Sequence, residues 1–172
     1  MNLKWRSLFA LAFVLLCAPT WAAEYWVSPG GSNLQNPGTQ AAPWRTLNHA
    51  LGGARMRAGD TLHVTPGVYD QDTLVVTVSG TADAPIRVAG EPGAKIHCTG
   101  RDGFFIMKNA DNTIRPAYLI FEGLEVYGAA RAGFLCSWGS SHITIRNCHI
   151  HDCGEWACMI DASDYAVIEN CI

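Results

Sequence analysis

Residues 145–148 read IRNC, and residues 168–171 repeat them as IENC, 23 residues later. One period earlier, residues 121–126 (FEGLEV) match residues 145–150 (IRNCHI) at a spacing of 24. Repeats with a period of roughly 20 to 50 residues are typical of solenoids. Because each period contains short β-rich runs and no helical pattern, a β-solenoid is favoured over a leucine-rich or helical array.

The alternation of apolar residues changes phase inside each repeat. Ile143 and Ile145 share one parity, whereas Cys148 and Ile150 share the other. A strand presents successive side chains to opposite faces. The phase change at Asn147 therefore predicts a corner between two strands that both turn their apolar residues inward.

The corner position is occupied by residues suited to a sharp bend. Gly123 and Asn170 lie at the same place as Asn147 in the neighbouring periods. Glycine and asparagine tolerate the left-handed conformation, and stacked asparagine side chains can hydrogen-bond from coil to coil. A turn at residues 152–155 then leads to a further expected strand at 156–161. Three strands per coil, bent at fixed corners, predict an all-β parallel β-helix.

The cysteines can be placed on this register. We expect four of them to point inward as small buried hydrophobes: Cys98, Cys136, Cys148 and Cys171. Direct stacking of such residues between coils is poor geometry for a bridge. Cys153 and Cys158 flank one turn and are the candidate disulfide in an oxidising compartment.

The first 22 residues have the pattern of a secretory signal peptide. Lys4 and Arg6 precede an unbroken apolar run at residues 8–16, which is too short to cross a bilayer, and small residues lead to Ala22. The alternative is a retained N-terminal anchor. Residues 23–172 are expected to form one secreted or periplasmic domain, free of the membrane after cleavage. Their net charge of −5 argues against nucleic acid or an anionic membrane as partner.

Residues 24–100 are rich in turn signals and short β-rich runs. Within them, Leu47, Ala50 and Leu51 lie on one face of a short helix, which Thr46 can cap. One short helix followed only by strands predicts a helix that caps one end of the β stack.

The same region carries five short motifs in a fixed order. They are YWVSP at 25–29, NPGT at 36–39, APWRTL at 42–47, AGDT at 58–61 and PGVY at 66–69. In this order they resemble the opening of secreted bacterial right-handed parallel β-helix proteins of the pectate lyase and chondroitinase B-like superfamily. The resemblance implies that residues 24–100 form the cap and first coils, and residues 101–172 the start of the repeated body. It implies the activity only loosely, since members include lyases, epimerases, hydrolases and proteins without known activity.

Polysaccharide lyases of this superfamily cleave uronate polymers by β-elimination. A lysine or arginine removes the proton beside the sugar carboxylate, while Ca²⁺ or a second cation neutralises that carboxylate. The candidate residues in this chain are Arg131, His151, Asp152, Glu155, Asp161 and Asp164. In the functional interpretation the four acids form the rim of a sugar or calcium site, and His151 or Arg131 is the base. The alternative, which the sequence alone favours, is that all six are ordinary solvated turn residues.

Two further pairs of side chains are of types that bind metals or sugars. His149 and His151 share one strand face, but without a third ligand at a defined spacing the sequence predicts no metal site in this chain. Ca²⁺ is expected only in a longer parent protein. Trp138 and Trp156 lie at strand edges and could stack on sugar rings.

The repeat places Ile172 among the first residues of a strand, so the last coil is expected to be open. We therefore expect a chain truncated at its C-terminus, which self-associates through that coil.

The leading hypothesis for the function is that the chain is the N-terminal part of a secreted carbohydrate-active β-helix protein. It would be a pectate-lyase-like polysaccharide lyase acting on acidic polysaccharide, inactive as this fragment. The second hypothesis is a non-catalytic β-helix that binds, or is displayed on, surface glycans.

Overall fold

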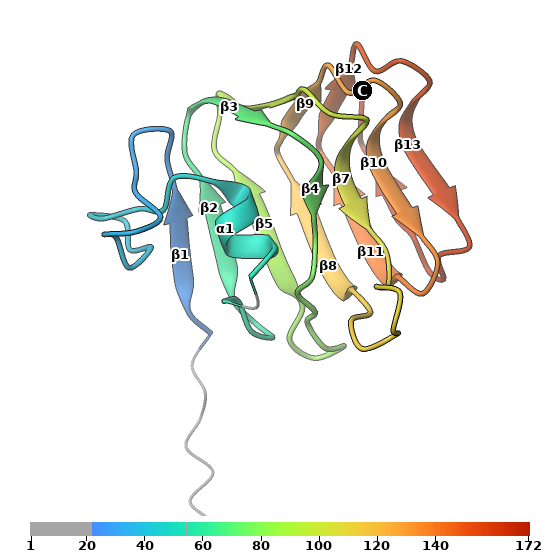
Figure 1. Ribbon diagram of the computed structural model, residues 1–172, viewed down its shortest axis with the longest axis horizontal. Helices are drawn as coiled ribbons and strands as arrows, with labels where there is room; N and C mark the ends of the chain where they lie inside the picture. Colours follow the sequence, from blue (N-terminus) through green and yellow to red (C-terminus); the bar gives the residue numbers. More distant parts are fainter. Residues whose placement is uncertain (1–21, 54) are drawn as a thin grey trace, which may run out of the picture.

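The computed structural model describes residues 22–53 and 55–172. The signal peptide predicted for residues 1–22 lies outside them, apart from Ala22. The described strands form three parallel sheets around one interior (Figure 1). The first sheet contains β1 (Glu24–Val27), β2 (Thr61–Val64), β5 (Ile86–Gly90), β8 (Ala117–Glu122), β11 (Ser141–Arg146) and β14 (Val167–Glu169). The second contains β3 (Gly67–Gln71), β6 (Ala94–Cys98), β9 (Glu125–Tyr127) and β12 (His149–His151). The third contains β4 (Leu74–Val75), β7 (Asp102–Ile106), β10 (Ala132–Ser137) and β13 (Trp156–Asp161).

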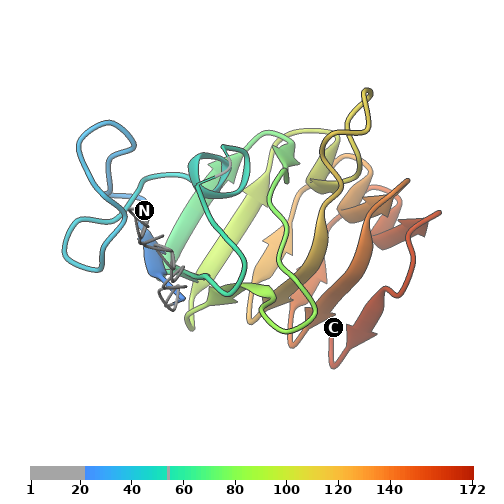
Figure 2. The same cartoon turned by 90° about the horizontal axis from the view of Figure 1, so that it is seen from below.

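The chain visits the three sheets in turn, and each strand pairs in parallel with its counterpart in the next coil. Figure 2 shows the coils following one another along the stack in sequence order. This arrangement confirms the predicted parallel β-helix with three strands per coil.

The predicted register and corners are also confirmed. Ile145 pairs with Phe121 in one neighbouring coil and with Ile168 in the other. The corners between the first and second sheets have positive φ angles: 68° at Gly123, 51° at Asn147 and 52° at Asn170. These are the left-handed values that a sharp corner requires and that glycine and asparagine tolerate best.

A second left-handed corner leads from the third sheet into the first. Tyr118, His142 and Tyr165 have φ angles of 54°, 53° and 55°, and their rings stack from coil to coil. The ring centroids lie 4.3 Å apart between Tyr118 and His142, and 4.6 Å apart between His142 and Tyr165. Stacked rings therefore line this second corner, whereas glycine and asparagine occupy the first.

Aromatic rings fill the centre of the stack. Phe104 and Phe134 are fully buried and stack face to face, with ring centroids 4.5 Å apart. Phe121, contributed by the first sheet, meets both rings edge-on at 5.1 and 5.4 Å. One aromatic cluster therefore joins β7 and β10 of the third sheet to β8 of the first sheet.

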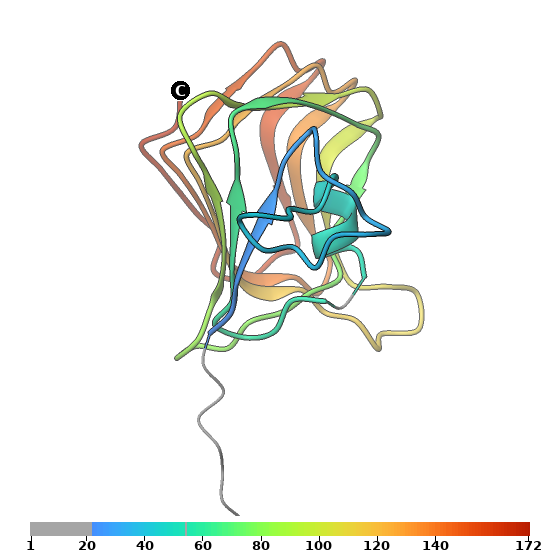
Figure 3. The same cartoon turned by 90° about the vertical axis from the view of Figure 1, so that its left-hand side faces the viewer.

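The N-terminal end of the stack is covered by α1 (Leu47–Leu51) and the loop before it (Figure 3). Leu47, Ala50 and Leu51 are buried, and the Thr46 hydroxyl accepts a hydrogen bond from the backbone N–H of His49 at 3.2 Å. The predicted capping helix is thus confirmed, with the apolar face and the N-cap that the sequence indicated. In the described residues no helix is long and apolar enough to cross a membrane.

The predicted inward cysteines line the interior. Cys98 and Cys136 are fully buried, Cys148 is almost so, and Cys171 is partly buried in the last coil. Burial raises the pKa of the Cys98 and Cys136 thiols to about 12 and that of Cys148 to about 11. These thiols are therefore protonated at neutral pH and pack as small apolar groups.

The candidate disulfide is not formed. Cys153 and Cys158 are both free thiols. Cys158 lies inside β13 opposite buried Phe134, whereas Cys153 lies in the preceding turn and directs its thiol to the carbonyl oxygen of His151 at 3.4 Å. The two side chains thus have separate packing sites.

The last described coil exposes residues of the kind that earlier coils bury. Ile168 is 47 % exposed, although its partner Ile145 in the preceding coil is 1 % exposed. Ile160 and Ile172 are exposed as well. The apolar columns of the interior therefore run to this face of the stack.

Candidate functional site

The six candidate residues do not converge on one site. Asp152 and Glu155 lie in the turn before β13, whereas Asp161 ends β13 and Asp164 follows it. A strand of six residues spans about 20 Å. The four carboxylates are therefore divided between opposite ends of one strand, and the predicted common rim for a sugar or Ca²⁺ is not formed.

Arg131 is committed to an ion pair. Its Nε and Nη2 atoms donate to the two carboxylate oxygens of Asp102 at 2.7 and 2.6 Å. Asp102 is 3 % exposed. The hydrogen bonds from Arg131 to Asp102, with a further contribution from the charge of Glu155, raise the pKa of the arginine. A guanidinium held in this way stays protonated, so its geometry suits a structural cation and not a base.

Arg131 also anchors the corner through its backbone. Its carbonyl oxygen accepts hydrogen bonds from the N–H groups of Glu155 and Trp156, at 2.9 and 3.0 Å. Its own N–H donates to the carbonyl of Arg101 at 2.7 Å. These contacts stack Arg131 on the turn of the next coil and are those of a structural corner.

Asp164 has a similar structural role. Its N–H donates to the carbonyl of Ser140 at 3.2 Å, and its carbonyl accepts from the N–H of His142 at 2.9 Å. Ser140 is almost fully buried, and its hydroxyl donates to that of Ser163 at 2.9 Å. These bonds fix the turn between the third and first sheets. Asp161 pairs with Ser137 at the end of β13.

His151 is the candidate with the richest polar surroundings. Its Nδ1 atom lies 2.8 Å from a carboxylate oxygen of Asp152, and its Nε2 atom lies 3.4 Å from Glu125. Glu125 also accepts a hydrogen bond from the ammonium of Lys95 at 2.9 Å. The hydrogen bond to Asp152 is the largest of the effects that raise the pKa of His151, and that from Lys95 leads those that lower the pKa of Glu125.

The outer face of the second sheet extends this cluster along the stack. The Tyr127 ring lies between His97, at 4.9 Å, and His151, at 5.3 Å, in nearly parallel planes. The His97 Nδ1 atom lies 2.7 Å from the Asp70 carboxylate. We call this surface of rings and carboxylates the imidazole face. It offers proton donors and acceptors, and it is the best-formed polar surface among the candidates.

Replacing His151 by glutamine is expected to lower the free energy of unfolding more at pH 5 than at pH 8. The pKa of His151 is raised in the folded state, so its contribution is fully present below the unfolded value of about 6.5 and is lost as pH rises through the folded pKa. Urea unfolding at both pH values measures the difference. His149→Gln is the matched control, because in the described residues that imidazole has no hydrogen bond to a carboxylate. An equal loss at both pH values would contradict the prediction.

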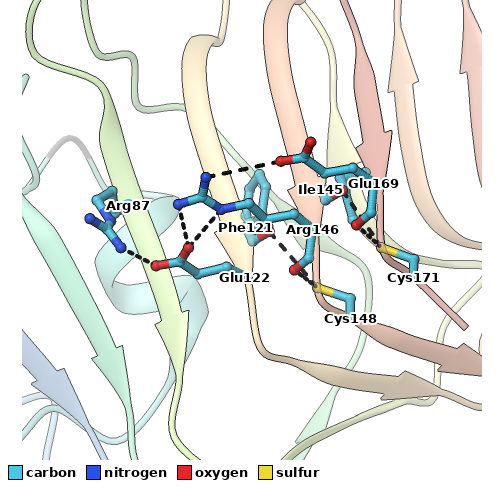
Figure 4. A network of polar contacts seen from close by, with 8 residues as sticks. All are labelled: Arg87, Phe121, Glu122, Ile145, Arg146, Cys148, Glu169 and Cys171. Carbon is cyan, nitrogen blue, oxygen red and sulfur yellow. Dashed lines mark hydrogen bonds and ion pairs between the residues drawn. The ribbon is translucent and has the colours of Figure 1, made fainter.

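Sequence reasoning missed a chain of charges on the outer face of the first sheet (Figure 4). Glu122 accepts hydrogen bonds from Arg87 and from Arg146, whose Nε atom lies 2.8 Å away. A nitrogen of Arg146 lies 4.0 Å from Glu169 in the next coil. Burial opposes ionisation of Glu122, but the two arginines outweigh it, and its pKa is lowered. The signal was present in the repeat, which places Glu122, Arg146 and Glu169 at equivalent positions.

The described residues contain no group of three or more histidine, cysteine, aspartate or glutamate side chains that could hold a metal ion. His149 and His151 do lie side by side, with ring centroids 4.4 Å apart. Trp138 and Trp156 are 58 % and 45 % exposed, as the predicted sugar-stacking role requires. That role stays a prediction.

Comparisons with known proteins fit this architecture. A family model described as "Right handed beta helix region" matches residues 93–172, and the model of a family of unknown function, DUF1565, matches residues 30–75. The fold is similar to that of pectate lyase Pel9A, with a TM-score of 0.67 and 23% identity over 85% of this chain. The chain has a right-handed parallel β-helix fold. The resemblance drawn from the five motifs is thus confirmed at the level of the fold.

Two other similar proteins are known. A rhamnogalacturonan lyase matches this β-helix with a TM-score of 0.55 and 19% identity over 87% of the chain. The uncharacterized protein YwoF of Bacillus subtilis (strain 168) is 33% identical over 134 residues, which are 73% of this chain. The chain spans 28% of YwoF, 38% of the pectate lyase and 51% of the rhamnogalacturonan lyase.

Proposed function

We propose that this chain is the N-terminal part of a secreted or periplasmic β-helix protein that acts on an acidic polysaccharide. The proposed reaction is β-elimination of the pectate lyase type. The observation that carries the proposal is the fold: two of the similar structures are lyases of pectate and of rhamnogalacturonan. The fold by itself leaves the substrate open, since one architecture hosts several chemistries.

The geometry of the candidate residues supports a division of roles. β-Elimination needs a base and a cation that converge on one uronate. In the described coils Arg131 is bound to Asp102, and the four candidate acids lie at two ends of β13. We therefore propose that these coils contribute to binding and stability, and that the chain by itself is inactive. A calcium site is proposed only for the longer protein.

A second function is favoured by the same ion pair. A bidentate contact between Arg131 and buried Asp102 is what a purely structural corner needs. A non-catalytic β-helix that binds surface glycans would keep this contact and need no base. The two functions differ in whether any unsaturated product is formed.

The assay that separates them follows the ultraviolet absorbance of the unsaturated uronate product. Residues 23–172 are incubated with polygalacturonate, rhamnogalacturonan and alginate, each with Ca²⁺ and with a chelator. We expect no product from this chain, and retardation of the chain in gels that contain the polysaccharide it recognises. Product formation would contradict the proposed inactivity, and absence of retardation in every gel would contradict the proposed substrate class.

Self-association through the last coil is part of the same proposal. Ile168 and Ile172 are exposed on that face, and exposed apolar strand edges pair readily with other chains. Light scattering over a dilution series accompanies the gel assay. A monomer at all concentrations would contradict self-association while leaving the glycan proposal intact.

A further inference from the structure

A groove lies where the cap meets the third sheet, between α1 and β4. Its volume is about 520 Å³, and its lining includes Asn48, His49, Arg55, Val75 and Thr77. The walls are fixed, because the N–H and the hydroxyl of Thr77 both donate to the carbonyl of Leu51, at 2.9 and 3.2 Å. Figure 1 shows α1 beside β4 at this end of the stack.

The groove carries a cation on a chain that is acidic overall. No aspartate or glutamate is among its lining residues, and Arg55 is exposed and in no ion pair formed by the described residues. One guanidinium nitrogen donates to the carbonyl of His49 at 3.4 Å, which holds the group over the groove. Arg55 is therefore a positioned guanidinium whose remaining donors have no partner among residues 22–53 and 55–172, the arrangement that suits a carboxylate.

The backbone beside Arg55 is shaped to admit it. A Cβ atom at Gly53 would collide with Nη1 of Arg55. Gly53 therefore leaves the space that the guanidinium occupies, and any side chain there would move it.

The other lining groups match the remainder of a sugar ring. Burial, and next the charge of Arg55, lower the pKa of His49, so its imidazole is neutral at neutral pH and can both donate and accept. The amide of Asn48 is exposed to the groove. Val75 is 45 % exposed and supplies an apolar patch between these polar groups. Neutral donors and acceptors, an apolar patch and one cation are complementary to the hydroxyls, C–H face and carboxylate of a uronic acid.

We infer that the groove between α1 and β4 binds one uronate residue of an acidic polysaccharide, with Arg55 contacting the carboxylate. The polymer class rests on the proposed function, whereas the groove and its charge are properties of the structure. A neighbouring groove of about 150 Å³ is lined by both Arg45 and Asp70, whose opposite charges make it less suited to an anion.

The test measures binding of oligogalacturonate to residues 23–172 by affinity electrophoresis and titration. Arg55→Gln is expected to weaken binding about fivefold, the effect of losing one exposed charged contact. Gly53→Ala is expected to weaken it less, because it displaces the guanidinium without removing it. Arg57→Gln is the matched control: it removes the same charge two residues away, outside the groove. Binding of the methyl-esterified oligosaccharide should be equal for wild type and Arg55→Gln.

Each other outcome is decisive. If the wild type binds oligogalacturonate and Arg55→Gln binds equally well, the groove assignment is wrong and the proposed function stands. If Arg57→Gln weakens binding as much as Arg55→Gln does, the effect is one of net charge, and the assignment is again wrong. If the wild type binds no acidic polysaccharide, both the groove assignment and the proposed function fail.

Discussion

Replacing Phe134 by alanine is expected to lower the free energy of unfolding by about 4 kcal/mol. Phe134 is fully buried and lies against the rings of Phe104 and Phe121, with centroids 4.5 and 5.4 Å away. The substitution removes apolar surface from the core and leaves a cavity between two sheets. Because parallel coils stack rigidly, the walls of that cavity cannot easily close.

Urea unfolding followed by tryptophan fluorescence, at protein concentrations below those that cause association, measures this loss. Val68→Ala is the matched control, because Val68 is 48 % exposed on the second sheet and its truncation should cost less than about 1 kcal/mol. A loss for Phe134→Ala as small as that of the control would show that the three rings are not the centre of the core.

Replacing Arg131 by methionine is expected to cost about 3 kcal/mol of unfolding free energy. The change leaves the carboxylate of Asp102, which is 3 % exposed, without its cation and without both of its bonds from Arg131. A buried charge that loses its partner is far more costly than an exposed one, for which about 1 kcal/mol is the usual limit.

The double variant Asp102→Leu with Arg131→Met tests whether the unpaired carboxylate causes the loss of stability. Replacing both charges by apolar groups removes the unpaired carboxylate, so most of the stability should return. A single Arg131→Met variant that loses less than about 1 kcal/mol would place the pair among ordinary surface ion pairs. In that case Arg131 would again be available as a candidate base.

The sequence predicted the coils correctly in the part of the chain that repeats without inserted loops. Arg146 contacts Glu122 at a separation of 24 residues, and Ser140 contacts Ser163 at 23, so these coils align by inspection. The asparagine at the corner revealed the bend because few residues accept a left-handed φ. The cap helix was predictable for a similar reason: Thr46 and three apolar residues encode it locally.

In the earlier coils the same repeat is not visible in the sequence, because loops of unequal length change its spacing. Arg131 contacts Asp102 at a separation of 29 residues, and Lys95 contacts Glu125 at 30. The extra residues lie largely between β7 and β8. Without the repeat spacing, the sequence could place Arg131 in its turn but could not identify its counterion. For this reason a structural arginine was among the candidate bases.

The candidate site depended on contacts that no local pattern encodes. His151 was a candidate in the sequence, yet its partner Glu125 belongs to the preceding coil. The groove at Arg55 was missed because it joins the cap to β4 across more than twenty residues of sequence. In a solenoid, sequence periodicity predicts what lies above and below a residue, whereas the cap and the long loops obey no such rule.

The alternating charges of Glu122, Arg146 and Glu169 restrict how this solenoid can change its length over evolution. Deleting the single coil that carries Arg146 would bring two carboxylates into neighbouring coils and create repulsion. Deleting or duplicating two coils together would preserve the order of signs. Gain and loss of coils in this part of the molecule are therefore expected to occur two coils at a time. This constraint comes from the charged residues on the outer face of the β-helix and not from its apolar interior.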